Sequence, residues 1–261
     1  MCLSAANAAL AFAAVLLPTV IAAQSPEAQT FTVLHSFVTA DGPQPEQGGL
    51  IQGTNGDLYG TTLYGGATSS GSVFKMTLGG KLTTIYNFCS PPVAGNCALG
   101  LAPGALVLGM NGDIYGVSAY GGLSGSGSVF KTIPSSGETV VIGIFQALEP
   151  PDETNSTGAY PVGALVEASD GKFWGVAQYG GQLGQGTKFE VGPKNGLGST
   201  VSFGCIEPNC SNGVLVAGGL VLGADGNFYG TTESGGTGAF GGGPGGGQYG
   251  ARSLALPRVA R

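Results

Sequence analysis

The sequence has little charge, few basic residues and a single histidine. Charged residues make up 9% of the chain, whereas they make up roughly a quarter of an ordinary soluble protein. The chain holds 9 lysines and arginines in 261 residues, and its formal net charge is −6. Because a nucleic-acid interface needs clustered lysine and arginine, we expect no nucleic acid among the partners.

The same shortage argues against catalysis and metal binding. The single histidine, His35, lies in an alternating apolar segment, and a Ser-His-Asp triad would have to be built on it alone. Three acids would suit a glycosidase pair, but Asp57, Asp113 and Asp225 each stand at an Asn-Gly or Asp-Gly dipeptide, where acids are ordinary turn formers. A calcium loop would need further oxygen ligands where aromatic residues and glycine follow. We therefore expect no catalytic residue, no metal site and no cofactor.

What the sequence does have is glycine, 51 residues of it, and a motif that recurs four times. Each copy runs from an Asn-Gly or Asp-Gly dipeptide to an aromatic residue and a glycine, and a Gly-Gly pair follows. The glycines after the aromatic residue are Gly60, Gly116, Gly175 and Gly230, so the copies recur every 55 to 59 residues. Recurrence at a nearly fixed period indicates an array of one supersecondary unit.

Each unit can be read as four short strands. In the first unit, alternating apolar and polar residues predict strands that begin at Gly49, Asp57, Gly71 and Leu82. The Asn-Gly dipeptide between the first two is a strong hairpin signal, because a type I′ turn needs positive φ at both central residues. The mid-strand aromatic residues are expected in the core, and they are Tyr59, Tyr115, Trp174 and Tyr229.

Four antiparallel strands per unit predict an all-β fold, a β-propeller-like array of about four-stranded blades. Three units are complete, at about residues 49–88, 104–145 and 163–203, and the fourth, at 219–236, lacks its third strand before a glycine-rich stretch. An open β-solenoid is the alternative fold. Residues 31–37 resemble the fourth strand of a unit, and a closed ring would use them to complete its last blade, which removes a free sheet edge.

The two ends of the chain differ from the repeats in composition. Residues 1–23 contain a short apolar run that ends in small residues, so we expect a signal peptide there and a β-repeat domain over residues 24–236. An uncleaved membrane anchor is the alternative, although the run is shorter than the roughly 20 apolar residues that a span needs. We expect a mature chain that is secreted or at the cell surface, without a transmembrane span. Residues 237–261 are predicted to form a disordered, glycine-rich tail.

The placement of cysteine agrees with export. Close pairs follow the last strand of two units, Cys89 with Cys97 and Cys205 with Cys210. In an oxidising compartment such pairs predict two local disulfides, each fixing a loop between units, and free thiols are the alternative. The two pairs are more than 100 residues apart, so a four-ligand zinc site is not expected.

The linked motifs of the repeats resemble a known family. They are Tyr59-Gly-Thr-Thr with Gly71-Ser-Val-Phe-Lys, Tyr115-Gly with Gly127-Ser-Val-Phe-Lys, and Trp174-Gly with Gly186-Thr-Lys-Phe-Glu. This pattern is similar to the GloVer tandem repeat of secreted bacterial proteins, over about residues 31–236. The third copy departs from it, with Lys188 and Glu190 where valine and lysine are usual. The resemblance implies export and an extracellular or surface array, and it brings no established activity.

The best candidates for a binding site are the tyrosines before the Gly-Gly pairs, Tyr64, Tyr120 and Tyr179, in whose place the fourth copy has Ser234. At a strand end beside a glycine-rich loop, these rings would line one face of the array. An aromatic ring with a hydroxyl tip suits sugars or peptide segments. Packing between neighbouring units is the alternative role.

We therefore interpret the chain as a secreted or cell-surface binding or adhesion module whose partner is a glycan or a surface protein. An extracellular hydrolase or lyase on a propeller scaffold is the alternative, because one fold hosts both kinds of function. Carboxylates that converge on one face would favour the enzyme, and exposed tyrosines without such acids would favour the binding module. A structural surface array without a small ligand is the third interpretation.

Overall fold

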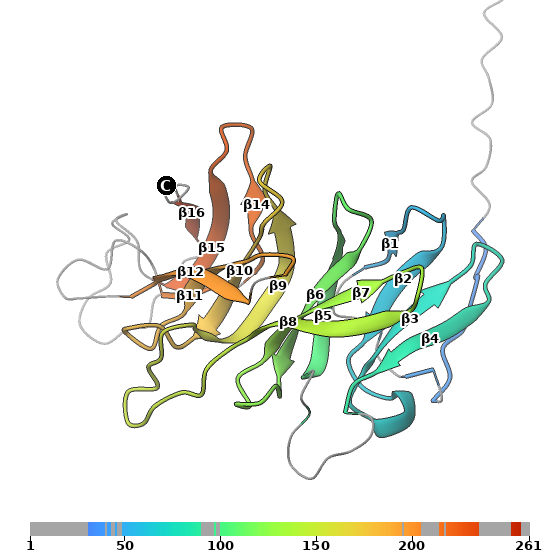
Figure 1. Cartoon of the computed structure of the whole chain (residues 1–261), viewed down its shortest axis with the longest axis horizontal. Coiled ribbons are helices and arrows are strands. Elements are labelled where there is room, and N and C mark those ends of the chain that lie inside the picture. Colours follow the sequence, from blue (N-terminus) through green and yellow to red (C-terminus); the bar gives the residue numbers. More distant parts are fainter. Residues whose placement is uncertain are drawn as a thin grey trace, which may run out of the picture. The chain divides into compact units, whose positions relative to one another are not determined.

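The computed structural model describes residues 31–39, 41–42, 45, 49–89, 97, 100–194, 196–204, 214–216, 218–234 and 252–256 (Figure 1). The described chain is all-β and forms four antiparallel sheets, one for each sequence unit. No sheet is closed among the described strands. The expected signal peptide, residues 1–23, lies outside the described residues.

The first three sheets have the same strand order, from the first strand to the fourth along the chain. The first sheet contains β1 (Ile51–Gln52), β2 (Leu58–Thr62), β3 (Ser72–Met76) and β4 (Leu82–Asn87), and a 3-10 turn, η1 (Gly66–Thr68), lies between β2 and β3. The second contains β5 (Leu101–Leu108), β6 (Ile114–Tyr120), β7 (Ser128–Ile133) and β8 (Glu138–Ile144). The third contains β9 (Ala159–Glu167), β10 (Phe173–Tyr179), β11 (Thr187–Val191) and β12 (Leu197–Ser202). This repetition confirms the predicted β-propeller-like array of four-stranded units.

The fourth sheet is built around β15 (Phe228–Ser234). One edge of β15 pairs with β13 (Val214–Val216) and β14 (Val221–Leu222), and the other pairs with β16 (Arg252–Leu256). Gly230 lies opposite Leu254 of β16, just as Gly60 lies opposite Phe74 of the third strand in the first sheet. The tail therefore supplies the third strand, which the repeat motif does not predict. A free strand edge presents unpaired backbone groups, and a segment without the motif can also pair with them. The rest of the expected disordered tail lies outside the described residues.

A glycine beneath a phenylalanine explains why two motifs of each repeat are linked. Gly60 in β2 lies opposite Phe74 in β3, and a Cβ atom built on Gly60 would lie 2.5 Å from Phe74 Cζ. Because packed interiors have no room for such an overlap, only glycine fits under the ring. The equivalent pairs are Gly116 with Phe130 and Gly175 with Phe189.

Phenylalanines also join each unit to the next. Phe88, after β4, meets Phe130 of the second sheet edge to face, with ring centroids 5.2 Å apart. Phe145, after β8, meets Phe189 of the third sheet in the same way at 4.9 Å. All four rings are buried, so the core runs from sheet to sheet.

The N-terminal segment makes the same contact without forming a strand. Residues 31–37 were expected as a strand but run as irregular chain, because no described strand pairs with them. Phe37 nevertheless meets Phe74 of β3 with ring centroids 5.2 Å apart. The segment thus resembles a fourth strand in its aromatic contact but not in its hydrogen bonding.

Three of the four mid-strand aromatic residues are buried as predicted, namely Tyr59, Tyr115 and Trp174. Tyr115 stacks on Phe173 of the next sheet, with ring centroids 3.9 Å apart. Tyr229 was also expected in the core but is 37% exposed, and its hydroxyl donates to Asp225 Oδ2 at 2.7 Å. The difference arises because Tyr229 belongs to the fourth sheet, after which no further sheet is described.

Candidate functional site

The predicted tyrosines lie at the ends of the second strands, opposite the Asn-Gly and Asp-Gly turns. Tyr120 and Tyr179 are the last residues of β6 and β10, and Tyr64 follows β2 closely. Tyr64 is 51% exposed and Tyr120 is 53% exposed, whereas Tyr179 is half-buried. Two cavities at this end of the sheets bring the three tyrosines into one region.

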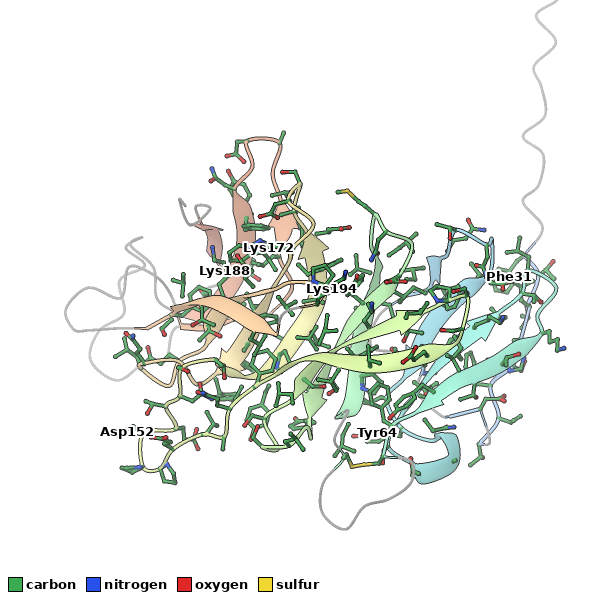
Figure 2. All side chains as sticks on the ribbon, in the orientation of Figure 1. Phe31, Tyr64, Asp152, Lys172, Lys188 and Lys194 are labelled. Atoms are coloured by element: carbon green, nitrogen blue, oxygen red, sulfur yellow. A yellow bond between two sulfur atoms is a disulfide. The ribbon has the colours of Figure 1, made fainter. Side chains whose placement is uncertain are left out.

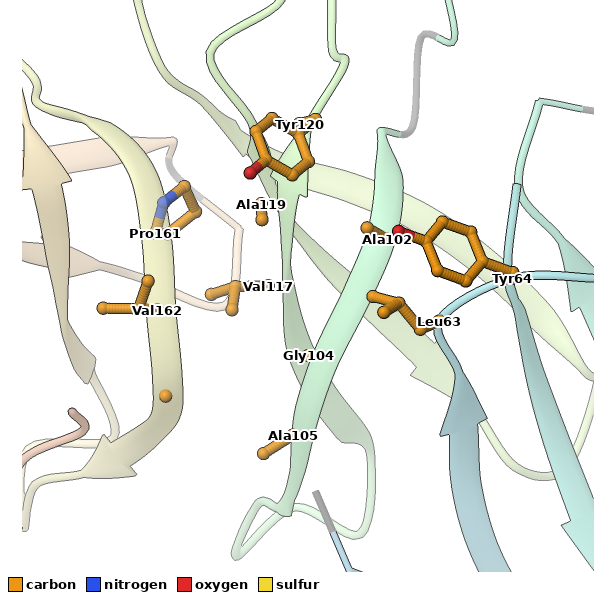
Figure 3. Close-up of a pocket in the computed structure, with 11 residues that line it drawn as sticks. Leu63, Tyr64, Ala102, Gly104, Ala105, Val117, Ala119, Tyr120, Pro161 and Val162 are labelled. Carbon is orange, nitrogen blue, oxygen red and sulfur yellow. The ribbon is translucent and has the colours of Figure 1, made fainter. Parts of the chain in front are cut away.

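The first cavity lies between Tyr64 and Tyr120 (Figure 3) and has a volume of about 290 Å³. Its walls include Ala102 of β5, Val117 of β6 and Pro161 of β9, so residues of two neighbouring sheets build it. None of the residues that line it is charged. The cavity therefore suits a neutral group with an apolar face and hydroxyls at its edge.

The second cavity shares Tyr120 and has a volume of about 370 Å³. The ring of Tyr160 lies 5.3 Å from that of Tyr120, with 55° between their planes, and 5.7 Å from that of Tyr179, at 84°. Glu153 and Gln178 add polar groups to the wall. The two cavities thus meet at Tyr120 and together extend over three repeats.

Tyr160 was missed from the sequence because it lies outside the recurring motif. Its φ is 54°, in the left-handed region that aromatic residues rarely adopt, and its N–H donates to Ser126 O at 2.9 Å. Ala102 takes the same conformation, with φ 51°, at the matching place in the second sheet. The sequence holds one signal for it. Ala102 and Tyr160 each precede a proline in the first strand of their unit, and the third repeat has tyrosine where the second has alanine.

The 146–158 loop, which joins β8 to β9, carries Glu153 to the second cavity. The side chain of Asn155 makes four of the hydrogen bonds that hold this loop. Its Oδ1 accepts hydrogen bonds from Gly158 N at 2.7 Å and from Gly181 N at 3.1 Å. Its Nδ2 donates to the carbonyls of Gln146 and Gly158. The loop is therefore attached to the Gly-Gly pair of the third repeat.

Cys97, between β4 and β5, takes part in a disulfide and in a hydrogen bond to the second repeat. Cys89 and Cys97 are bonded, which confirms the first predicted pair. Cys97 O accepts a hydrogen bond from Gly122 N at 2.8 Å, so the loop is tied to the Gly-Gly pair of the second repeat. The second predicted pair, Cys205 and Cys210, lies outside the described residues.

The acids of the turns lie at the other end of the sheets, where they are paired within their own repeats. The ion pairs are Asp57 with Lys75 at 3.8 Å and Asp113 with Lys131 at 3.3 Å. Asp225 accepts a hydrogen bond from Tyr229 and others from Asn227, and these bonds lower the pKa of its carboxyl. The acids are held as turn residues and do not converge on one place.

The third repeat reverses this ion pair. Lys172 stands at the place of the turn acid, Glu190 stands at the place of the lysine, and Lys172 Nζ lies 2.5 Å from Glu190 Oε1. The other departure, Lys188, is buried with Nζ 4.6 Å from the ring centroid of Trp174. Burial lowers the pKa of Lys188, and the nearby Glu190 opposes that change.

The single histidine lies in a local ion pair. His35 Nε2 lies 3.0 Å from Asp41 Oδ2, and hydrogen bonds from Val38 N and from His35 lower the pKa of Asp41. Within the described ranges, no group of three or more histidine, cysteine or acidic side chains could hold a metal ion. No described helix is long and apolar enough to span a membrane.

The fold and the tyrosine-bearing end of its sheets define a tandem-repeat, β-propeller-like protein. Residues 19–243 match the family described as the Gloeobacter/Verrucomicrobia repeat, and the chain belongs to that family. The resemblance drawn from the linked motifs is thereby confirmed. No curated protein matches the chain.

Several solved structures are similar to the chain at low identity. A protein described as a gluconolactonase is 14% identical, with a TM-score of 0.44 over 72% of this chain and 58% of that one. A protein of unknown function from Dyadobacter fermentans is 14% identical, with a TM-score of 0.45 over 79% and 59%. The extracellular domain of a hybrid two-component system from B. thetaiotaomicron is 16% identical, with a TM-score of 0.41 over 70% and 19%. The chain spans less than two thirds of the length of each.

Proposed function

We propose that the chain is a secreted or cell-surface binding module and that the tyrosine-bearing end of its sheets holds a glycan. The observation that carries this proposal is the pair of half-exposed rings, Tyr64 and Tyr120, on either side of an uncharged cavity of about 290 Å³. An apolar wall favours the carbon face of a sugar ring, and the phenol hydroxyls bond its hydroxyls. The Cys89–Cys97 disulfide supports a location outside the cytosol, where disulfides persist.

A protein segment is the second candidate ligand. Two leucines of the Gly-Gly loops favour it. Leu123, which follows Tyr120 in the sequence, is 63% exposed, and Leu183, which follows Tyr179, is 40% exposed. Exposed apolar side chains are typical of surfaces that contact other proteins.

A hydrolase or lyase has less support. Carboxylate-based hydrolysis of a glycoside uses two acids roughly 5 to 10 Å apart. Of the residues that line the two cavities, Glu153 alone carries a carboxylate. The turn acids are engaged at the opposite end of the sheets. A binding role therefore accounts for more of the observed geometry.

The test is binding of the full chain to a glycan array. The variant carries Tyr64→Ala, Tyr120→Ala and Tyr179→Ala together, and the control carries Met110→Ala, which removes a 77% exposed side chain at the turn end. We expect selective glycan binding that the control retains and the variant loses while its circular dichroism stays unchanged. Binding that is absent from the array, or equal in the triple variant, would contradict a glycan site at these tyrosines.

A further inference from the structure

The second cavity differs from the first in its walls. Three tyrosine rings border it, and Tyr160 meets Tyr120 and Tyr179 at interplanar angles of 55° and 84°. Rings at such steep angles to one another line the cavity in different planes and do not form a flat stacking platform. The face of each ring carries negative partial charge, so a cage of this kind attracts a cation.

The second cavity also differs in its charge. The 146–158 loop holds Glu149, Asp152 and Glu153 and contains no lysine or arginine. Glu153 lines the cavity itself. Figure 2 shows Asp152 on this loop, away from the labelled Lys172, Lys188 and Lys194. Negatively charged carboxylates near a cavity raise the local concentration of cations.

The walls are held in place before any ligand arrives. Tyr160 and Glu153 both have left-handed backbone conformations, with φ of 54° and 52°. Non-glycine residues in this region cost roughly 1 to 3 kcal/mol and gather at ligand sites, where the surrounding structure enforces them. Here Asn155 makes four hydrogen bonds that fix the loop. A pre-organised site loses less entropy on binding.

We propose that the second cavity binds an organic ammonium group, with the faces of Tyr120, Tyr160 and Tyr179 around the cation and Glu153 as its counter-charge. This inference rests on the proposed function and deepens it, since Tyr120 belongs to both cavities. A glycan whose neutral ring occupies the first cavity would place an amino group in the second. A choline headgroup offers the same chemistry from a different source.

The test is calorimetric titration of the full chain with choline. The matched control ligand is its neutral isostere, in which a tert-butyl group replaces the trimethylammonium group. We expect choline to bind about tenfold more tightly than the isostere, because the attraction of a cation to aromatic faces is lost with the charge. We expect Glu153→Gln to weaken choline binding severalfold and to leave the isostere unaffected.

A Tyr160→Asn variant removes one wall while keeping a residue that tolerates positive φ, so its fold is expected to survive. It should lose choline binding, whereas Met110→Ala should not.

A second arm compares protonated glucosamine with N-acetylglucosamine, and tighter binding of the amine than of choline points to an amino sugar. Two results would overturn the ammonium site. One is equal affinity for choline and its isostere, and the other is choline binding that neither Glu153→Gln nor Tyr160→Asn weakens.

Failure of this inference is distinguishable from failure of the proposed function. If the chain retains a neutral glycan through Tyr64 but does not prefer choline to its isostere, the binding module stands and the ammonium site falls. If no glycan is retained but choline binds and Tyr160→Asn abolishes that binding, the ammonium site stands and the glycan assignment falls.

Discussion

The reversed ion pair of the third repeat provides a direct test of how the repeats are built. Trp174 lies opposite Glu190 in the register that places Tyr59 opposite Lys75. The third repeat therefore uses the same geometry with the signs exchanged. We consider three variants of the full chain, Lys172→Asp, Glu190→Lys and the two together, the last of which restores the charge order of the first two repeats.

The expected magnitudes follow from the exposure of the pair. Lys172 is 36% exposed and Glu190 is 14% exposed, so the pair is worth about 1 kcal/mol, at the upper end for pairs near the surface. Each single substitution removes this attraction and creates a like-charge contact, so each should lower the free energy of unfolding by about 1 to 2 kcal/mol. Glu190→Lys should be the more harmful, because Glu190 also favours the charged form of Lys188. The double variant should lie within about 1 kcal/mol of the native chain, a coupling energy of about 2 kcal/mol.

The assay is equilibrium unfolding in urea of the native chain and the three variants, at low and at high salt. Salt should reduce the coupling energy, because part of the pair faces solvent. The equivalent exchange in the second repeat, Asp113→Lys with Lys131→Glu, serves as the control and should be tolerated equally. A double variant as unstable as the sum of its two single variants would refute the interpretation of Lys172 and Glu190 as an exchanged pair.

Two further predictions concern the core. Lys188→Met should change how the free energy of unfolding depends on pH, because it removes a buried titratable group. Burial lowers the pKa of Lys188 in the folded chain, so the native chain should gain stability as the pH rises through that pKa toward 10.5. Unfolding curves of the variant should lack that gain. Parallel pH profiles of the two proteins would contradict this prediction. Gly60→Ala should cost about 1 to 3 kcal/mol because the added Cβ meets the ring of Phe74, whereas Gly79→Ala, whose Cβ meets nothing closer than 3.7 Å, should be nearly neutral by thermal unfolding. Equal losses in the two glycine variants would count against the close fit.

The local part of the fold could be predicted from the sequence. The Asn-Gly turns, the strand alternation and the recurrence of the motif are set by residues close together in the chain, which is why the four units were found. The third strand of the fourth unit could not be predicted, because β16 lacks the Gly-Ser-Val-Phe-Lys motif and pairs through its backbone. The exposure of Tyr229 was missed for a related reason, since burial of that position depends on the next sheet.

The candidate site was predictable only in part. Tyr64, Tyr120 and Tyr179 recur at a fixed distance from the motif, so their common placement follows from the repeat. Tyr160 and Glu153 do not recur. Their positions depend on left-handed backbone conformations and on a hydrogen bond that Asn155 accepts from Gly181 N in a distant turn. Such long-range contacts leave no local pattern in the sequence, and the second cavity therefore became visible only in the folded chain.

The measurement that tests the central claim most directly is hydrogen–deuterium exchange of the full chain, alone and with its tightest ligand from the glycan array. The account predicts slower exchange at the tyrosine-bearing end, in the Gly-Gly loops after Tyr64, Tyr120 and Tyr179 and in the 146–158 loop. The Asn-Gly and Asp-Gly turns at the opposite end should exchange at unchanged rates. Protection confined to those turns would contradict the claim that the tyrosine-bearing end is the binding face.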